Sequence, residues 1–228
     1  MAPTVTNPDG PDVYSPYTPD SAYQGGPGGG HAKREYECGM RFDGHWKNDD
    51  EYGPGTLQVD TGSSYVGEWH AGLFHGEGKY AWASGSVYEG QWVEGRKEGR
   101  GKLTLYSGNT YQGEWVKDQR HGWGLYKVAK PTAGGIAVYE GEWVKDDRTG
   151  KGTTKGIDGA LEINKYENGM RVGDGVRWLN ASRLKANEPS GPFRLKDGKE
   201  IKGITATEAE GIAKSLGLPV PSVEGFHP

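Results

Sequence analysis

Residues 65–78 read YVGEWHAGLFHGEG, and the same pattern returns along most of the chain. Its tryptophan position recurs in steps of 23 residues and then, after a five-residue insertion, at one further Trp and at a Tyr; the six positions are Trp46, Trp69, Trp92, Trp115, Trp143 and Tyr166. Glycines stand seven and nine residues after each of these positions. A fixed period of this length indicates a repeat array, in which each unit buries its apolar face only against its neighbours.

Each unit predicts a β-hairpin. In residues 78–92, apolar and polar side chains alternate before the pair Ser84-Gly85 and alternate again after it, from Tyr80 on one side to Trp92 on the other. A period of two on both sides of a turn signal is typical of two antiparallel strands. The repeat therefore predicts an all-β fold, a single-layer antiparallel meander of about 12 strands.

The recurring glycines have two expected roles. The glycine two residues before each tryptophan, such as Gly67, shares a strand face with it and leaves room for a neighbouring ring to lie flat over the backbone. The Gly-x-Gly pair after each tryptophan, such as Gly76 and Gly78, is expected to supply the positive φ angles that return the chain to the next hairpin.

Composition divides the chain into three segments. Residues 1–32 carry six prolines and no Lys or Arg, which fits either an unstructured tail or an extended peptide that docks on a partner through Tyr14, Tyr17 and Tyr23. Residues 33–179 hold about six repeat units, and the insertion at residues 130–136 is expected to lengthen one turn without breaking the array. In residues 180–228 we expect a hairpin around Asp197-Gly198, then one short helix that starts with a capping box and shields the last edge of the sheet.

Several classes of protein fit this chain poorly. The net charge of −4 disfavours a nucleic-acid or anionic-lipid binder. The single Cys38 excludes an internal disulfide and suits a reducing compartment, and neither a signal peptide nor a run of ~20 apolar residues is visible.

No residue pattern predicts catalysis, a metal site or a cofactor. His75 and His121 occupy equivalent positions but lack recurring ligands beside them, so we interpret them as turn-packing residues. Residues 150–153, GKGT, match only part of a phosphate-binding loop, because Lys145 stands where that motif needs glycine. The basic cluster of Arg96, Lys97, Arg100 and Lys102 fits either a solvated face or a contact with phosphoinositide or an acidic protein.

The unit at residues 65–78 closely resembles the MORN repeat, the membrane occupation and recognition nexus, whose pattern is roughly Tyr-x-Gly-x-Trp-x-x-Gly-x-x-x-Gly-x-Gly. The resemblance implies a hairpin array with an aromatic-lined groove and no intrinsic activity. The chain is also similar to free-standing MORN proteins of cilia, including those of axonemal radial spokes, which implies a cytoskeletal setting in the cytoplasm, in a cilium or flagellum.

From these observations we expect a non-enzymatic scaffold that binds helical or extended segments of other proteins, in an axonemal or cytoskeletal complex. The expected groove residues are the aromatic pairs of three central units: Tyr65, Trp69, Tyr88, Trp92, Tyr111 and Trp115. Self-association is possible for such a sheet. The alternative is a peripheral membrane tether that binds anionic phospholipids. It is disfavoured because a recurring position where a lipid binder would need Lys holds Glu68, Gln91, Glu114 and Glu142.

Overall fold

The computed structural model describes residues 29–179 and 192–218. Within these residues, fifteen strands follow one another in chain order in an open antiparallel sheet, which confirms the predicted all-β meander. They are β1 (Gly29–Glu35), β2 (Arg41–Lys47), β3 (Asp50–Gln58), β4 (Ser64–His70), β5 (Leu73–Ala81), β6 (Val87–Val93), β7 (Arg96–Thr104), β8 (Thr110–Val116), β9 (Gln119–Lys127), β10 (Ile136–Val144), β11 (Asp147–Gly156), β12 (Leu161–Glu167), β13 (Met170–Trp178), β14 (Phe193–Lys196) and β15 (Lys199–Gly203). One helix, α1 (Ala206–Ser215), follows them.

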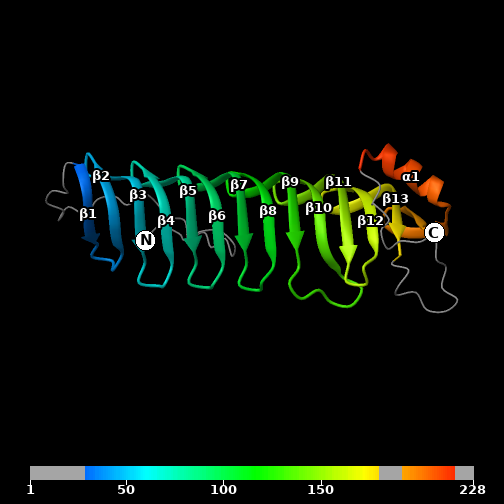
Figure 1. The fold of residues 1–228 in the computed structure, drawn as a ribbon, viewed down its shortest axis with the longest axis horizontal. Helices are drawn as coiled ribbons and strands as arrows, with labels where there is room; N and C mark the ends of the chain where they lie inside the picture. The colour runs from blue at the N-terminus through cyan, green and yellow to red at the C-terminus, as the bar shows by residue number, and fades with distance from the viewer. Residues whose placement is uncertain (1–28, 180–191, 219–228) are drawn as a thin grey trace. The chain divides into compact units, whose positions relative to one another are not determined.

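The chain divides into two compact units. The first comprises Met1–Ser107 with Glu114–Gln119, and the second comprises Gly108–Gly113 with Arg120–Pro228. In the first unit, β1 to β7 lie side by side in chain order (Figure 1). In the second unit, β10 pairs with β9 across the insertion, so this longer turn leaves the array unbroken, as the sequence predicts.

Two kinds of turn join the strands. At one end of the strands, two residues with left-handed backbone make the connection, as Glu94 (φ 49) and Gly95 (φ 77) do between β6 and β7. At the opposite end of the strands the turns are longer. In the turn between β5 and β6, the Trp82 N–H donates to the Ser86 carbonyl at 2.9 Å. Most of these turns are short enough to join antiparallel neighbours, and in the described residues the strand order of the sheet is the order of the chain.

The prediction that the Gly-x-Gly pair returns the chain to the next hairpin is wrong. Gly76 has a positive φ of 57, but it lies inside β5, opposite a register shift between Gly67 and Glu68. This arrangement is a β-bulge, in which two extra residues, Gly76 and Glu77, bend the strand. The glycine pair therefore bends the sheet, and the two-residue turns reverse the chain.

The bend lets a tyrosine ring lie on the backbone of its own hairpin. Gly67 and Gly78 face each other across β4 and β5, and a Cβ on either one would collide with the Tyr65 side chain. The Tyr65 hydroxyl donates to the Glu68 carbonyl at 3.0 Å, so it returns to the backbone just beyond the bend. The same arrangement recurs for Tyr88 in the next hairpin. This confirms the expected role of the glycine before each tryptophan.

The tryptophans join each hairpin to the one before it. The Trp92 indole N–H donates to the Gly78 carbonyl at 3.2 Å, and the Trp115 indole N–H donates to the Gly101 carbonyl at 3.2 Å. The indoles also pack edge to face against the tyrosines, as Trp92 does on Tyr65 at 5.7 Å. Since a single sheet has no second layer to bury against, these rings are its core.

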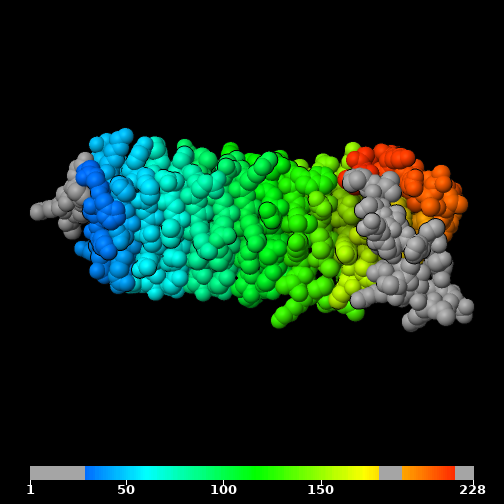
Figure 2. Space-filling model, viewed as in Figure 1, coloured from blue at the N-terminus to red at the C-terminus, as the bar shows by residue number. Residues whose placement is uncertain are grey.

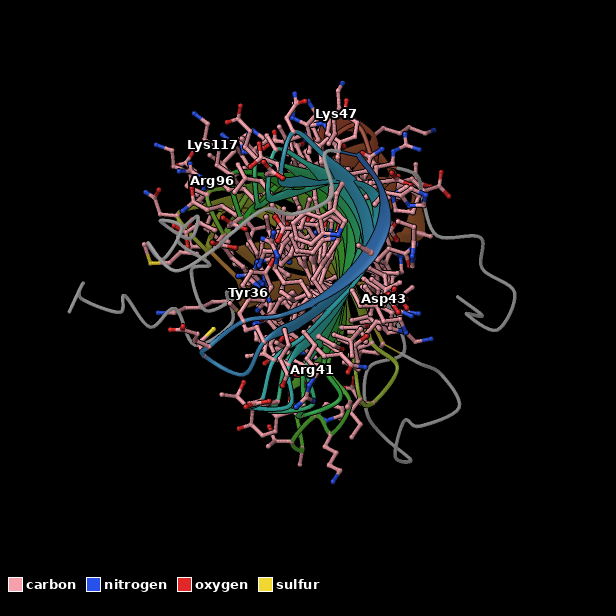
Figure 3. The ribbon with its side chains drawn as sticks, turned by 90° about the vertical axis from the view of Figure 1, so that its left-hand side faces the viewer. Tyr36, Arg41, Asp43, Lys47, Arg96 and Lys117 are labelled. Carbon is pink, nitrogen blue, oxygen red and sulfur yellow. The ribbon has the colours of Figure 1, made fainter. Side chains whose placement is uncertain are left out.

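The bent sheet has an aromatic inner face and a polar outer face. In the first unit, viewed from the β1 end, Tyr36 lies on the concave side of the strands and Asp43 on the convex side (Figure 3). Lys47, Arg96 and Lys117 lie along the edge that carries the two-residue turns (Figure 3). Figure 2 shows the side chains of the first strands, in blue and cyan, closing into a continuous surface. Beneath this surface the aromatic rings pack on one another, as Tyr65 does on Trp69 at 5.3 Å.

The C-terminal elements form as the sequence predicts, with one correction. Strands β14 and β15 form the hairpin around Asp197-Gly198, and Thr205 with Glu208 forms the capping box at the start of α1. The helix does not shield the last edge, because all five residues of β15 are exposed. Its Ala213 and the following Leu218 pack instead against Ile163 of β12, on one face of the sheet.

The segment boundaries differ slightly from those expected. Strand β1 begins at Gly29, so residues 29–32 of the expected tail belong to the sheet. Its pairing with β2 runs from Gly29 to Glu35. The rest of that tail, including Tyr14, Tyr17 and Tyr23, lies outside the described residues.

Candidate functional site

All six predicted groove residues are buried. The exposed fraction is 0% for Tyr65, Tyr88 and Trp92, 2% for Trp69 and Tyr111, and 3% for Trp115. The structure brings five of them together in the first unit, where Tyr65 contacts Trp69 at 5.3 Å and Tyr88 contacts Trp92 at 5.0 Å and Trp115 at 5.4 Å. Tyr111 belongs to the second unit and packs on Trp143 at 5.4 Å.

These rings form the floor of the concave face, and a partner would meet other side chains first. Trp82 and Tyr126 are only half-buried on this face, and each packs beside a buried ring: Trp82 on Tyr80 at 4.7 Å and Tyr126 on Trp143 at 6.3 Å. They extend the aromatic face toward solvent. Trp82 and Tyr126 are not among the six predicted groove residues, although both occupy inward-facing positions of their repeats' alternating pattern.

A second recurring position, five residues after each Trp or Tyr position, also lies on the concave face. We call it the slot position; its occupants are Glu51, Phe74, Lys97, Arg120, Arg148 and Arg171. Phe74 stacks on Tyr65 at 3.9 Å, and the Lys97 Nζ lies 4.7 Å from the Trp115 ring. The fixed spacing is the signal in the sequence that identifies these residues as a set.

The slot position changes the interpretation of the basic cluster. Lys97 is only 1% exposed, whereas Arg96, Arg100 and Lys102 point outward and are exposed. Because adjacent residues of a strand face opposite sides, Lys97 does not share a surface with the other three cations. The cluster therefore offers less charge to a membrane than its sequence implies.

The second unit has a hollow beside Trp143. This cavity of about 270 Å³ is lined by Arg120, Tyr126, Trp143, Asp146, Asp147, Arg148 and Gly169. The Arg120 Nε donates to Asp146 Oδ1 at 2.8 Å, and its guanidinium carbon lies 4.3 Å from the Trp143 ring centre. The Arg148 guanidinium carbon lies 4.5 Å from the Tyr139 ring centre. The hollow thus combines an aromatic floor with two guanidinium groups.

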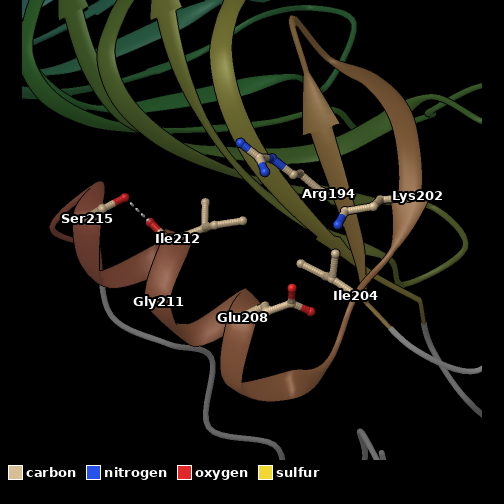
Figure 4. Close-up of a pocket in the computed structure, with 7 residues that line it drawn as sticks. All are labelled: Arg194, Lys202, Ile204, Glu208, Gly211, Ile212 and Ser215. Carbon is tan, nitrogen blue, oxygen red and sulfur yellow. Dashed lines mark hydrogen bonds between the residues drawn. The ribbon is translucent and has the colours of Figure 1, made fainter.

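A second hollow, of about 260 Å³, lies between α1 and the β14–β15 hairpin (Figure 4). Arg194, Lys202 and Glu208 line it together with Ile204 and Ile212. Arg194 pairs with Asp174 at 2.9 Å. The hydrogen bonds from Thr205 hold the pKa of the Glu208 carboxyl below its usual value. Both charged groups are therefore engaged by neighbouring residues of the fold.

The buried tyrosines keep their protons at neutral pH. Burial raises the pKa of Tyr65, with a further contribution from Glu68, and burial also raises the pKa of Tyr139. Both hydroxyls are therefore protonated at neutral pH. Within residues 29–179 and 192–218, no group of three or more His, Cys, Asp or Glu side chains is placed to hold a metal ion.

The convex face is polar and carries isolated apolar residues. Lys79 pairs with Glu89 at 2.7 Å across β5 and β6, and this contact lowers the pKa of Glu89. Val66 and Val93 are exposed by 53% and 43%. None of the helices in the described part of the chain is both long and apolar enough to cross a bilayer.

Comparison with known proteins identifies the repeat. No curated protein matches the chain. Among solved structures, the chain is similar to the SAS-4 (dCPAP) TCP domain of Drosophila melanogaster in complex with a proline-rich motif of Ana2 (dSTIL). The two share 12% sequence identity with a TM-score of 0.40, over 71% of this chain and 92% of that chain.

The sequence profile of the MORN repeat matches residues 65–87, 88–110, 111–127 and 139–160. These four matches are the units in which a tyrosine lies on the paired glycines and a tryptophan follows four residues later. The chain therefore carries four tandem MORN repeats.

Proposed function

We propose that this protein is a non-enzymatic scaffold that binds a helical or extended segment of partner proteins along the concave aromatic face. The repeat family indicates a binding scaffold for proteins or membranes. The observation that carries the proposal is that the face is already assembled: stacked rings and indole hydrogen bonds fix its floor before a partner arrives. A rigid surface binds with a smaller loss of conformational entropy than a flexible one.

The half-buried residues above the floor make the first contacts in this proposal. Trp82 in the first unit and Tyr126 in the second provide apolar area at the surface, and Arg148 provides charge. The buried rings, including Trp92, act by holding these residues in place. Truncating Trp92 would therefore alter the fold and the binding face together, whereas truncating Trp82 reports mainly on binding.

The experiment that tests the proposal is affinity purification with a matched variant. Tagged wild-type protein and Trp82→Ala are used to capture proteins from isolated cilia and from whole-cell extract. We expect proteins that wild type retains and Trp82→Ala loses, with Val66→Ala on the convex face behaving as wild type. An identical set of captured proteins for all three baits would contradict the proposal.

We further propose a ciliary setting, in the axoneme or a radial spoke, because residues 173–178, 196–199 and 216–221 resemble the corresponding segments of free-standing ciliary MORN proteins. A fluorescent fusion expressed in a ciliated cell tests this directly. Enrichment along the axoneme is the expected result, and exclusion from the cilium would contradict it.

A further inference from the structure

The two-residue turns place a carboxylate beside the slot position of the preceding hairpin. In the first unit, Asp118 Oδ1 accepts a hydrogen bond from the Lys97 backbone N–H at 2.9 Å. In the second, Asp146 Oδ1 accepts from the backbone N–H of Arg120 at 3.0 Å and from its Nε at 2.8 Å. Both aspartates end their turns with a φ of 70. Two successive turns therefore place a carboxylate next to a slot cation.

At the next turn this position has no side chain. Gly169 occupies it with a φ of 76, and its N–H donates to the Arg148 carbonyl at 2.9 Å, as the Asp146 N–H does to the Arg120 carbonyl at 3.1 Å. A Cβ added to Gly169 would meet only the Asp147 Oδ1, at 3.8 Å. The backbone is thus in the arrangement that holds Asp146, but the space for the carboxylate is open to the hollow beside Trp143.

Arg148 is held in place without a carboxylate. Its guanidinium packs on Tyr139 at 4.5 Å and near Trp143 at 6.0 Å. The flanking slot residues have ion partners, Arg120 with Asp146 and Arg171 with Glu162, but no carboxylate of residues 29–179 or 192–218 pairs with Arg148. A guanidinium stacked on aromatic rings keeps its in-plane N–H donors available for a carboxylate.

We propose that an aspartate or glutamate side chain of the partner segment occupies this position and accepts hydrogen bonds from Arg148. The inference rests on the proposed function and adds the chemistry of the partner, an acidic segment. Asp146 and Asp147 also line the hollow. They disfavour a doubly charged phosphate more than a single carboxylate, because like-charge repulsion grows with the charge of the ligand.

Placing the missing carboxylate on the protein itself tests the proposal. Gly169→Asp adds the side chain that Asp118 and Asp146 already carry at nearly the same φ, and Gly169→Asn is the uncharged control of similar size. We expect Gly169→Asp to unfold at a higher temperature than Gly169→Asn, and this difference to disappear when Arg148 is also changed to Gln. That readout needs no partner.

The binding probe is a fluorescein-labelled peptide of ten glutamates, measured by anisotropy at low salt with full-length protein. Wild type and Gly169→Asn should bind it, whereas Gly169→Asp and Arg148→Gln should bind at least fivefold more weakly. Asp147→Asn should bind more tightly, because it removes a negative charge at the rim. A peptide of ten glutamines should not bind.

Three outcomes would overturn the inference. They are equal unfolding temperatures for Gly169→Asp and Gly169→Asn, glutamate-peptide binding that is absent or insensitive to both Arg148→Gln and Gly169→Asp, and binding of inorganic phosphate in preference to the glutamate peptide. Each leaves the proposed function standing if Trp82→Ala still loses captured proteins. If Trp82→Ala loses none while the glutamate peptide binds through Arg148, the proposed aromatic face fails and the anion site remains.

Discussion

The ring of Tyr65 lies directly on the backbone of Gly78, so that a Cβ on this glycine would stand only 2.5 Å from the Tyr65 Cζ. The contact joins two strands at the point where the sheet bends. It explains why glycine recurs at this position of the repeat: the ring that fills the bend needs the volume of the missing side chain.

This contact predicts that Gly78→Ala destabilises the protein by about 3 kcal/mol, because the ring must leave its position or the bend must open. Urea denaturation followed by circular dichroism measures the change. The control is Gly211→Ala in α1, where a Cβ would meet nothing within 4 Å. That variant should gain roughly 0.5–1 kcal/mol, since alanine is the better helix former. An unchanged midpoint for Gly78→Ala would show that the ring can move at no cost.

The tryptophans should differ in their sensitivity to loss of the indole N–H. Trp92 donates to the Gly78 carbonyl at 3.2 Å, whereas the buried Trp69 Nε1 has no hydrogen-bond partner. Trp92→Phe should therefore cost about 1 kcal/mol more than Trp69→Phe, the net value of a typical hydrogen bond. Thermal unfolding of the two variants compares them, and a larger cost for Trp69→Phe would contradict this reading of the ring network.

Stability should fall at high pH because of the buried tyrosines. Burial raises the pKa of Tyr65 and Tyr139 in the folded protein, whereas in the unfolded chain each phenol ionises near pH 10. Their contribution is complete below pH 10 and decreases above it, by about 1.4 kcal/mol per pH unit for each buried tyrosine. Urea unfolding at pH 8 and pH 11 measures this loss.

Phenylalanine variants separate the buried tyrosines from the exposed ones. Tyr139→Phe should reduce the loss of stability between pH 8 and pH 11, and Tyr106→Phe, at a residue that is 79% exposed, should leave it unchanged. Equal pH dependence in the two variants would mean that Tyr139 ionises freely in the folded protein.

The fold could be predicted because the hairpin pattern recurs in every repeat. The burial of the aromatic rings could not be predicted in this way. Alternation and turn residues predict hairpins from local sequence alone. The burial of Tyr88 depends on the bend at the paired glycines Gly90 and Gly101, because its ring lies against both of them. Trp92 packs on this ring at 5.0 Å. A one-dimensional pattern locates such glycines but does not distinguish a bulge from a turn, because both need a positive φ; Gly76 lies in a bulge.

The slot position shows that residues adjacent in sequence can lie on opposite faces of the sheet. Arg96 and Lys97 are adjacent in the basic cluster, but Arg96 is exposed whereas Lys97 is only 1% exposed. The Lys97 Nζ lies 4.7 Å from the Trp115 ring centre. Lys97, Arg120 and Arg148 form one set because each stands five residues after the tryptophan of its repeat. The open carboxylate position at Gly169 appears only when the turns are compared in three dimensions.

The split of this cluster predicts weak interaction with membranes. At ~0.15 M salt, exposed charges are strongly screened, so we expect no preference for anionic over neutral liposomes in co-sedimentation. Preferential binding to phosphoinositide vesicles, lost when Arg96, Arg100 and Lys102 are changed to Ala, would favour the membrane tether instead.

The central claim is that the concave aromatic face binds a partner segment, and calorimetry with a purified partner tests it most directly. Trp82→Ala removes a half-buried ring from this face, and Val66→Ala removes a residue that is 53% exposed on the convex face. With both variants as stable as wild type, we predict that Trp82→Ala weakens binding at least tenfold, about 1.4 kcal/mol, and that Val66→Ala leaves it unchanged. Wild-type affinity in Trp82→Ala with loss of binding in Val66→Ala would contradict the claim and place the partner on the convex face.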